Sequence, residues 1–257
     1  MLAYQEIAES TYYFTSTFPF MGEALLPVNR FAIKGSKKSM VIDTGAPAQS
    51  RQSLQELSEV INPAELDYIF ISHMDAEHYG GMFDLLAAAP KARIVCNMTS
   101  FGKGTSLYGI APERFAVVFP GQEIDLGDRV VRVEPSLIED GHTDWLFDTR
   151  THTYFTSDAF GSIQFGPAAL YAETVPSEAF FGGFTLWQGA NFNMLPRVDL
   201  KKFEAALRHM QAQDVQQIAS VHGPVIRQDV GQVFEMMLSM PTAEMPAPPP
   251  LPPFLHL

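Results

Sequence analysis

The stretch His73-Met74-Asp75-Ala76-Glu77-His78 places four potential metal ligands within six residues. It follows the apolar run Tyr68-Ile69-Phe70-Ile71, whose β-branched and aromatic residues predict a buried strand. After two glycines, residues 82–89 predict a helix that ends before Pro90. The four donors therefore lie in a loop between a strand and a helix, where side chains two and five residues apart are able to converge. Two imidazoles and two carboxylates suit iron, zinc or manganese better than calcium or copper. The competing interpretation is a solvated polar loop.

The composition bounds the kind of protein and the kind of partner. The chain has 257 residues, of which 46% are hydrophobic and 18% charged, which is typical of a globular protein with a substantial core. The net charge of −12 argues against nucleic acid or an anionic membrane as the main partner. The single cysteine, Cys96, lies in a predicted strand, so we expect a buried, inert thiol and a reducing compartment. Because no signal peptide or membrane-length apolar run is visible, we expect a cytoplasmic protein.

The order of predicted elements indicates the fold class. Residues 4–43 predict a β-meander, and strands alternate with helices after it. Helical spacing covers residues 48–61, 200–213 and 230–240, while 167–196 predicts a helix only in its middle and 99–107 is ambiguous. Further strands are expected at residues 93–96, 115–119, 130–133, 145–147, 151–157 and 218–221. This order predicts an α/β protein, an αββα sandwich formed by residues 1–240.

The last segment, residues 241–257, is rich in proline and cannot form a helix or a central strand. We expect an extended, polyproline-like tail outside the core. Two interpretations remain open for it: a solvated end, or an apolar tip at Phe254-Leu255 that docks on a neighbouring subunit.

Three further donors follow later strands of the chain. His142 lies in Gly141-His142-Thr143, Asp158 lies in Ser157-Asp158-Ala159-Phe160-Gly161, and His222 lies in Val221-His222-Gly223-Pro224. Each stands at a strand terminus close to glycine, as expected where loops from a sheet converge on one site. A lone histidine is usually structural, but three such positions together with the opening stretch favour a metal site.

Taken in order, these residues resemble the binuclear metal signature of the metallo-β-lactamase superfamily. The likeness extends over residues 28–230 and includes Asp43-Thr44-Gly45 ahead of the ligands. Within the superfamily the closer likeness is to the diiron domain of flavodiiron proteins, the oxygen and nitric oxide reductases. Those proteins carry a carboxylate at the position of Asp75, where zinc hydrolases carry a third histidine. The segments 155–161 and 221–227 also resemble flavodiiron segments.

The resemblance implies a ligand set and a cofactor. It assigns His73, Asp75 and His142 to one metal, Glu77 and His222 to the other, Asp158 to the bridge, and His78 either to the second metal or to its support. The cofactor implied is two iron ions bridged by an oxo, hydroxo or peroxo group, with zinc or manganese as alternatives. The family order is Glu then Asp where this chain has Asp75 and Glu77. The shorter aspartate requires the backbone at Asp75 to approach the metal or leaves a coordination position open.

Other residues have two interpretations each. Asp43-Thr44-Gly45 spells an aspartic-protease motif, but its single copy favours support of the ligand loop. Tyr79 either lines the pocket and hydrogen-bonds a bound oxygen species or packs ordinarily. His152 and His209 are expected to be structural. Five aromatic residues are expected either to lie in the core or to form an apolar lid that excludes water from the metal site: Phe160, Phe180, Phe181, Phe184 and Trp187.

The functional hypothesis is a non-heme diiron protein that binds O₂ or NO. It would act as an oxygen sensor or as a reductase with a separate electron donor, so the sequence leaves open whether it is an enzyme. Flavodiiron reductases carry a flavodoxin-like domain after this one, and the sequence shows no such module, so no flavin is expected within this chain. The alternatives are a zinc-dependent metallo-hydrolase and a metal-stabilised binding protein without turnover. A signalling protein is a further expected partner, and a homodimer is favoured.

Overall fold

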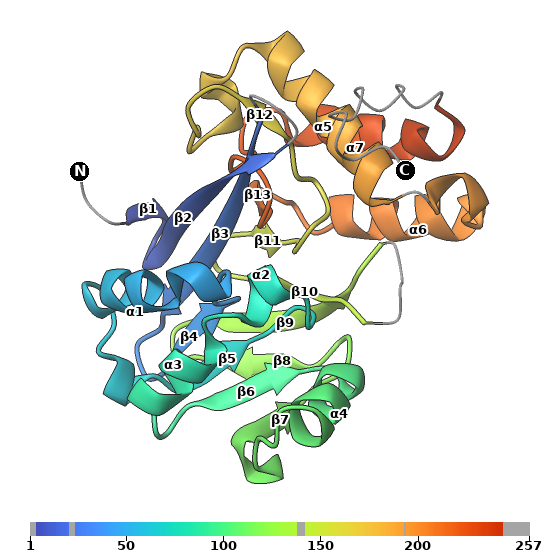
Figure 1. Ribbon diagram of the computed structural model, residues 1–257. Helices are drawn as coiled ribbons and strands as arrows, with labels where there is room; N and C mark the ends of the chain where they lie inside the picture. Colours follow the sequence, from blue (N-terminus) through green and yellow to red (C-terminus); the bar gives the residue numbers. More distant parts are fainter. Residues whose placement is uncertain (1–3, 21–23, 138–141, 193, 244–257) are drawn as a thin grey trace, which may run out of the picture. The chain divides into compact units, whose positions relative to one another are not determined.

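The computed structural model describes residues 4–20, 24–137, 142–192 and 194–243 (Figure 1). These residues form two compact units: the first comprises Met1–Ser16 and Val28–Ser157, the second Thr17–Pro27 and Asp158–Leu257. The expected polyproline-like tail lies outside the described residues, except for a 3-10 turn at Met240–Thr242. Across the described chain, no helix combines the length and the apolar character that crossing a bilayer requires.

The first unit contains a sheet whose strands follow one another in chain order. The pairs β1–β2 and β3–β4 are antiparallel, whereas β4 to β7 are parallel. This confirms the predicted β-meander followed by alternating strands and helices. The strands are β1 (Gln5–Ala8), β2 (Thr11–Phe20), β3 (Ala24–Lys34), β4 (Ser39–Ile42), β5 (Tyr68–Phe70), β6 (Arg93–Cys96) and β7 (Phe115–Val117).

Helices cover one face of this sheet (Figure 1). They are α1 (Ser50–Ser58), the short α2 (Ala76–Tyr79), α3 (Met82–Ala88) and α4 (Met98–Ser106). Leu57 of α1 and Leu85 of α3 share a buried apolar cluster with Ile69 of β5. The ambiguous segment 99–107 forms α4 because Asn97 caps it by accepting from the Ser100 amide.

A second, antiparallel sheet belongs to the same unit. It contains β8 (Glu123–Asp125), β9 (Val130–Pro135), β10 (Asp144–Asp148) and β11 (Thr153–Phe155). The rings of Phe31 in the first sheet and Phe155 in the second lie 5.2 Å apart, centroid to centroid. The first unit is therefore a sandwich of two sheets with helices on one outer face. The sequence did not predict β8, because its Glu-Ile-Asp pattern is polar and short.

The parallel strands position the residues of interest at one edge. The Asp43 amide donates to the Phe70 carbonyl at 2.9 Å, and the Ile71 amide donates to the Val95 carbonyl at 3.0 Å. Asp43 follows β4, and His73 follows β5 after two residues. Because the carboxyl ends of parallel strands meet at one edge, these two residues become neighbours although they are distant in sequence.

The second unit is mainly helical. Its helices are α5 (Ser177–Asn191), α6 (Leu200–Gln211) and α7 (Val230–Ser239), which confirms the helices predicted from spacing. Strand β12 (Gln164–Phe165) pairs antiparallel with Leu25 and Ala24, and β13 (Gln217–Ala219) comes before α7. Phe160 lies against Phe184 of α5 and Phe234 of α7, at ring distances of 6.4 Å and 5.7 Å. These aromatic residues form the core of the unit.

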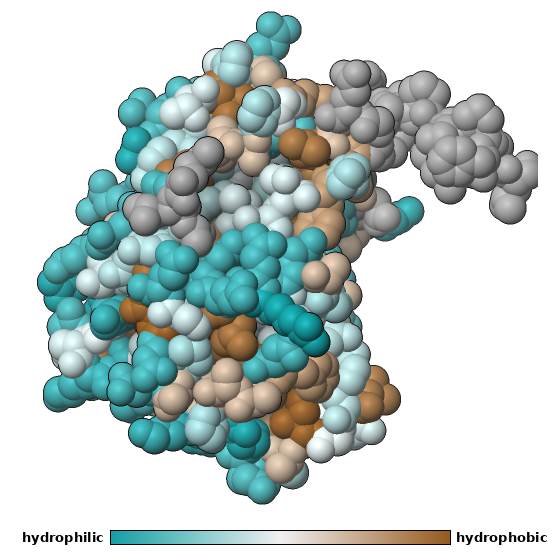
Figure 2. All heavy atoms as spheres, turned by 60° about the vertical axis from the view of Figure 1, so that its left-hand side comes forward, coloured by the Kyte–Doolittle hydropathy of each residue, from teal (hydrophilic) through white to brown (hydrophobic). Residues whose placement is uncertain are grey.

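Short 3-10 turns connect several elements of the described chain, and three of them begin at a proline, whose fixed φ suits the first turn. They span Pro47–Gln49, Pro63–Glu65, Pro112–Arg114, Ala172–Thr174 and Leu195–Arg197. The face seen in Figure 2 is largely hydrophilic with scattered hydrophobic residues, as the acidic composition leads one to expect.

Candidate metal-binding residues

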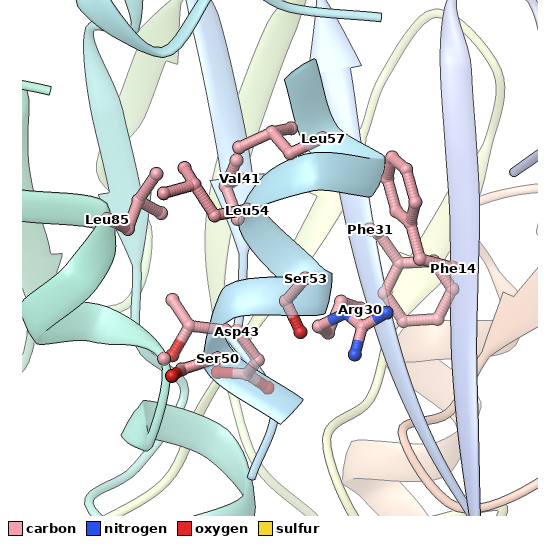
Figure 3. A pocket seen from close by; sticks show the side chains of 12 residues that line it. Phe14, Arg30, Phe31, Val41, Asp43, Ser50, Ser53, Leu54, Leu57 and Leu85 are labelled. Atoms are coloured by element: carbon pink, nitrogen blue, oxygen red, sulfur yellow. The ribbon is translucent and has the colours of Figure 1, made fainter. Parts of the chain in front are cut away.

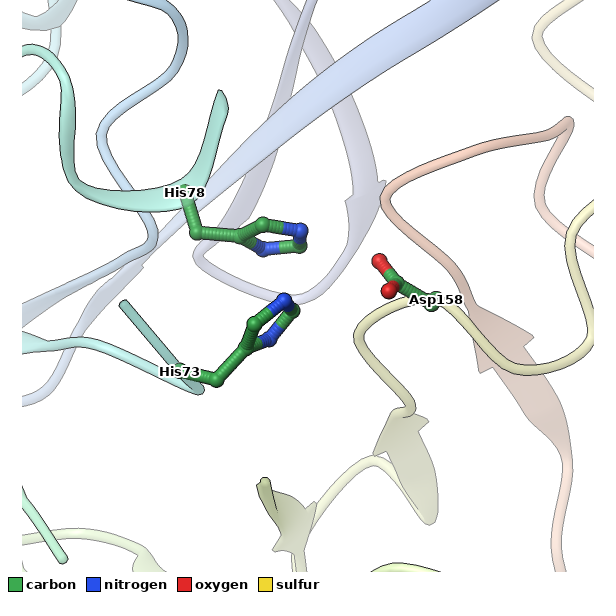
Figure 4. Close-up of side chains that lie close together, drawn as sticks. All are labelled: His73, His78 and Asp158. Atoms are coloured by element: carbon green, nitrogen blue, oxygen red, sulfur yellow. The ribbon is translucent and has the colours of Figure 1, made fainter. Parts of the chain in front are cut away.

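His73 and His78 of the first unit face one another at the carboxyl edge of the parallel strands (Figure 4). Their ring centroids are 4.0 Å apart, and the side chains are buried, with 5% and 0% of each residue exposed. His73 comes from the loop after β5, whereas His78 lies in α2. The short helix α2 turns the chain back within five residues, so both imidazoles reach the same place.

A hydrogen-bond network orients both imidazole rings through their Nδ1 atoms. His78 Nδ1 lies 2.9 Å from Asp43 Oδ2, and the amide and hydroxyl of Ser72 each donate to that carboxylate at 2.9 Å. The Ser72 hydroxyl also lies 2.9 Å from the Ser157 hydroxyl, which is 3.1 Å from His73 Nδ1. An ionised Asp43 only accepts, so the protons run in one direction, from His73 Nδ1 through Ser157 and Ser72 to Asp43. With this arrangement both histidines carry their proton on Nδ1, which leaves Nε2 as the nitrogen that could coordinate a metal.

Two residues of this network have unusual backbone conformations. Asp43 has φ +53° and Ser157 has φ +51°, both in the left-handed region that non-glycine residues rarely adopt. Such conformations cost about 1–3 kcal/mol each and persist where the surroundings hold them. Asp43 has the supporting role predicted for the Asp-Thr-Gly segment, and its completely buried carboxylate is engaged with His78 and Ser72.

The two carboxylates of the opening stretch lie beside these histidines in the chain. Asp75 Oδ2 is 3.6 Å from His73 Nε2, and the Asp75 side chain is 65% exposed. Glu77 is half-buried in α2, directly before His78. His142 is exposed, and its carbonyl accepts from the Asn97 amide nitrogen at 2.5 Å. Its predecessor Gly141 lies outside the described residues.

Tyr79 packs among other aromatic residues. Its hydroxyl lies 2.5 Å from that of Tyr108, and its ring lies edge-on to Phe83 at 6.5 Å. The hydrogen bond to Tyr108, together with burial, raises the pKa of Tyr79 to about 12. Of the two roles considered for Tyr79, these contacts favour packing.

In the second unit, Asp158 and His222 form a pair of candidate metal ligands. His222 Nε2 lies 3.1 Å from Asp158 Oδ1, and its Nδ1 lies 2.8 Å from the Pro27 carbonyl. Because a carbonyl only accepts, Nδ1 donates the proton and Nε2 faces the carboxylate. His222 is 1% exposed and Asp158 has 20% of its side chain exposed.

Helix α5 also contacts Asp158, through Trp187 and Asn191. The Trp187 indole nitrogen donates to the Asp158 carbonyl at 2.7 Å, and Asn191 Nδ2 lies 3.4 Å from Asp158 Oδ2. The Trp187 ring also packs on His222 at 4.8 Å. A Cβ at Gly161 would lie 2.6 Å from the indole nitrogen, so only glycine permits this approach. Trp187 thus supports the candidate ligands in addition to its place in the core.

The donor chemistry of each unit fits a metal ion. All three buried histidines are held through Nδ1, by Ser157, Asp43 or the Pro27 carbonyl, which is the usual arrangement for metal-ligating histidines. Two ligands about 2.1 Å from one ion and at right angles are about 3 Å apart. The distance between His222 and Asp158 matches this spacing. The other two predicted histidines are placed elsewhere: His152 contacts Phe147 before β11, and His209 is exposed on α6.

Sequence reasoning missed several residues around these donors. Ser72 and Ser157 directly precede His73 and Asp158, so adjacency to a predicted ligand was an available signal. Asn191 and the Pro27 carbonyl had none, because their contacts join segments far apart in the chain.

Comparison with known proteins connects this geometry to a family. The anaerobic nitric oxide reductase flavorubredoxin of Salmonella arizonae is 26% identical over 212 residues, covering 82% of this chain and 43% of that protein. This chain thus spans less than half the length of that relative.

Two solved structures share the fold. The rubredoxin:oxygen oxidoreductase of Desulfovibrio gigas superimposes with a TM-score of 0.78 at 16% identity, over 92% of this chain and 60% of that chain. The flavodiiron protein of Giardia intestinalis gives a TM-score of 0.78 at 17% identity, over 93% and 59% of the respective chains. Finally, residues 24–219 match the metallo-beta-lactamase superfamily, and because that match covers most of the sequence, the chain belongs to this superfamily.

Proposed function

We propose that this chain is a non-heme diiron protein that binds O₂ or NO. One observation supports the proposal most directly. His73, His78 and His222 are all buried and hydrogen-bonded through Nδ1, so Nε2 is the nitrogen that would coordinate a metal. Similarity to a nitric oxide reductase flavorubredoxin supports the same chemistry.

The proposed ligand set follows the predicted one. One ion would take His73, Asp75 and His142, the other Glu77 and His222, with Asp158 between them. His78 is a ligand of the second ion, because its Nε2 is the nitrogen not used by Asp43. An oxygen-rich set with imidazoles suits iron, which when bound supplies reversible binding of O₂ or NO.

The residues of this chain supply orientation and a low dielectric. Asp43 accepts a hydrogen bond from Nδ1 of His78, which makes His78 a stronger ligand. Ser157 accepts a hydrogen bond from Nδ1 of His73 and is itself linked to Asp43 through the Ser72 hydroxyl. Trp187 covers the His222 ring and holds the Asp158 backbone, limiting access of water to this side. These contacts predefine the donor positions before a metal enters.

Two modes of action are compatible with this centre. In one, the protein senses oxygen in the cytoplasm and passes the signal to a partner protein. In the other, it reduces O₂ or NO with electrons from a separate donor, as the name of the flavorubredoxin relative suggests. A homodimer is proposed for either mode. Catalytic turnover with a chemical reductant distinguishes the reductase from the sensor.

Metal content and spectroscopy test the proposal. Protein loaded anaerobically with Fe(II) should hold two iron ions per chain and develop a visible charge-transfer band on exposure to air. His78→Ala, Asp158→Asn and His222→Ala should each lower the iron content, whereas His209→Ala, an exposed histidine of α6, should not. Protein that takes up zinc in preference to iron, and stays colourless in air, would contradict the diiron proposal and favour a metallo-hydrolase.

A further inference from the structure

Two side chains of α5 donate hydrogen bonds to the same residue, Asp158. The Trp187 indole nitrogen donates to its main-chain carbonyl at 2.7 Å, and Asn191 Nδ2 donates to its carboxylate oxygen Oδ2 at 3.4 Å. Trp187 and Asn191 are four residues apart in one continuous helix, so they lie on the same face of α5. The helix therefore contacts Asp158 at two points, one on the backbone and one on the side chain.

The two carboxylate oxygens of Asp158 have different surroundings. Oδ2 accepts from the Asn191 amide, whereas Oδ1 lies 3.1 Å from His222 Nε2. His222 donates through Nδ1 to the Pro27 carbonyl, so the neutral imidazole carries its lone pair on Nε2. Asn191 therefore engages the oxygen that is not turned toward the other candidate ligand of the second unit.

The orientation of this carboxylate is not decided by its own rotamer. The χ2 torsion of an aspartate has broad, roughly two-fold preferences, so either oxygen can face a given neighbour. The Asp158 side chain is 20% exposed, so close packing does not fix it on every side. A hydrogen bond to Oδ2 restricts the rotation and lowers the entropic cost of ordering the carboxylate when an ion binds.

The backbone that follows this aspartate is attached to α5 without Asn191. Gln188 Nε2 donates to the Gly161 carbonyl at 2.9 Å, and the Ile163 amide donates to the Gly183 carbonyl at 3.2 Å. The Asn191 amide instead contacts the carboxylate, and Asn191 itself is only half-buried. Loss of its amide should therefore free the carboxylate while the backbone stays in place.

We propose that Asn191 is a positioning residue that keeps Oδ1 of Asp158 directed toward His222 Nε2, so that both donors are in place before a metal ion binds. The inference rests on the proposed function, because Asp158 is a ligand there. Hydrogen-bond partners of metal ligands commonly contribute a factor of roughly 10–100 to metal affinity. We therefore expect loss of the Asn191 amide to weaken metal binding at least tenfold.

Titration of the full-length, metal-free protein with Co(II) tests this inference without iron or oxygen chemistry. The visible absorption of Co(II) depends on its ligands, so one titration gives both the affinity and a spectroscopic signature. Asn191→Leu, which has nearly the same size but no amide, should bind at least tenfold more weakly and give altered bands. The matched control Gln188→Leu removes a hydrogen bond of the same helix that does not involve Asp158. It should lower the denaturation midpoint but leave the bands like those of the parent.

Two further measurements separate positioning from general packing. In a double-mutant cycle, Asn191→Leu should have no additional effect on Co(II) affinity once Asp158→Ala has removed the carboxylate, because nothing remains to be positioned. Crystal structures of the metal-free parent and of Asn191→Leu give a readout without any metal. In the variant, the Asp158 carboxylate should turn away from His222 Nε2 while the backbone keeps its place.

Three results would overturn the inference and leave the proposed function standing. The first is Co(II) affinity and bands like those of the parent in Asn191→Leu. The second is an unchanged Asp158 carboxylate in the metal-free variant. The third is additive effects of the two substitutions in the cycle, as a purely structural role would give. A parent protein that binds no Co(II) would instead contradict the proposed metal centre, and this inference with it.

Discussion

At the scale of single residues, the groups behind the candidate ligands decide what the histidines do. Asp43 is the common acceptor of the network in the first unit, because His78 and Ser72 both hydrogen-bond to its carboxylate. Without that acceptor, nothing fixes the direction of the protons through Ser72 and Ser157. The tautomers of His73 and His78 therefore depend on one buried carboxylate.

Asp43→Asn should weaken metal retention while the fold persists. An amide has nearly the same shape, but its nitrogen cannot accept from His78, so that ring loses its orienting partner. Removal of such a partner typically lowers metal affinity by roughly 10–100-fold. Competition with a chelator measures the change. Asp84→Asn, at an exposed aspartate bound only by the Ser50 hydroxyl among its described contacts, should retain metal like the parent.

Cys96 offers a test by pH and thiol chemistry. Burial, with a contribution from Asp144, raises the pKa of this thiol from 9.0 to about 12. The folded state thus holds its proton where the unfolded state has lost it, so this group stabilises the fold below pH 9 and the contribution falls between pH 9 and about 12. At pH 8 a thiol reagent should label the unfolded protein at least a hundredfold faster than the folded one. Comparable rates would show that Cys96 is accessible.

At the scale of elements, the packing of α5 depends on which of its positions are glycine. Gly182 and Gly183 are adjacent, yet a Cβ at Gly182 would meet nothing within 4 Å, whereas one at Gly183 would lie 2.1 Å from the Ile163 carbonyl oxygen. At Gly183 the helix backbone thereby lies directly against the Ile163 carbonyl.

These two positions form a matched pair for stability measurement. Gly182→Ala should raise the free energy of unfolding by up to about 1 kcal/mol, because alanine favours helix. Gly183→Ala should lower it by about 1–3 kcal/mol through overpacking. Denaturant titration gives both values. Equal effects of the two substitutions would contradict the close approach of α5.

Arg129, which forms an ion pair within the second sheet of the first unit, also hydrogen-bonds to the first sheet. Arg129 donates to Asp148 at 3.0 Å, to the Thr11 hydroxyl at 3.2 Å and to the Glu9 carbonyl at 2.8 Å. Both charged side chains are completely buried. Asp148→Asn should lower the free energy of unfolding by about 3–5 kcal/mol, because it leaves the guanidinium charge without its counter-charge.

The neighbouring pair Arg150–Asp128 provides the control. Its side chains are 36% and 31% exposed, so solvent screens the interaction. Asp128→Asn should change the free energy of unfolding by at most about 1 kcal/mol. If both substitutions had the same small effect, the buried charge of Arg129 would not depend on Asp148 as its counter-charge.

At the scale of the whole molecule, the proposed ligands come from both units of the chain. A ligand that binds only the folded protein stabilises it by about 4 kcal/mol when its free concentration is a thousand times Kd. Fe(II) or a redox-inert substitute should raise the unfolding temperature of each unit that contributes a ligand. Scanning calorimetry of the parent and of His222→Ala with and without metal measures this. Stabilisation of only one unit would show that the other contributes no ligand.

Much of the fold was predictable because it depends on local patterns. The meander in residues 4–43, the parallel strands and the helices at α1, α3, α6 and α7 follow from apolar periodicity and breakers. The exceptions have local causes: β8 is short and polar, and α4 contains two glycines but is capped by Asn97.

By itself, then, the sequence determined the class of fold and which side chains are candidate metal donors, since the type and spacing of residues record both. Only the tertiary structure decided which groups orient those donors. Ser72 and Ser157 meet across 85 residues, and His222 meets the Pro27 carbonyl across 195. The physical reason is that a hydrogen bond requires two atoms about 3 Å apart, and that proximity arises from the packing of whole elements, which no local pattern encodes.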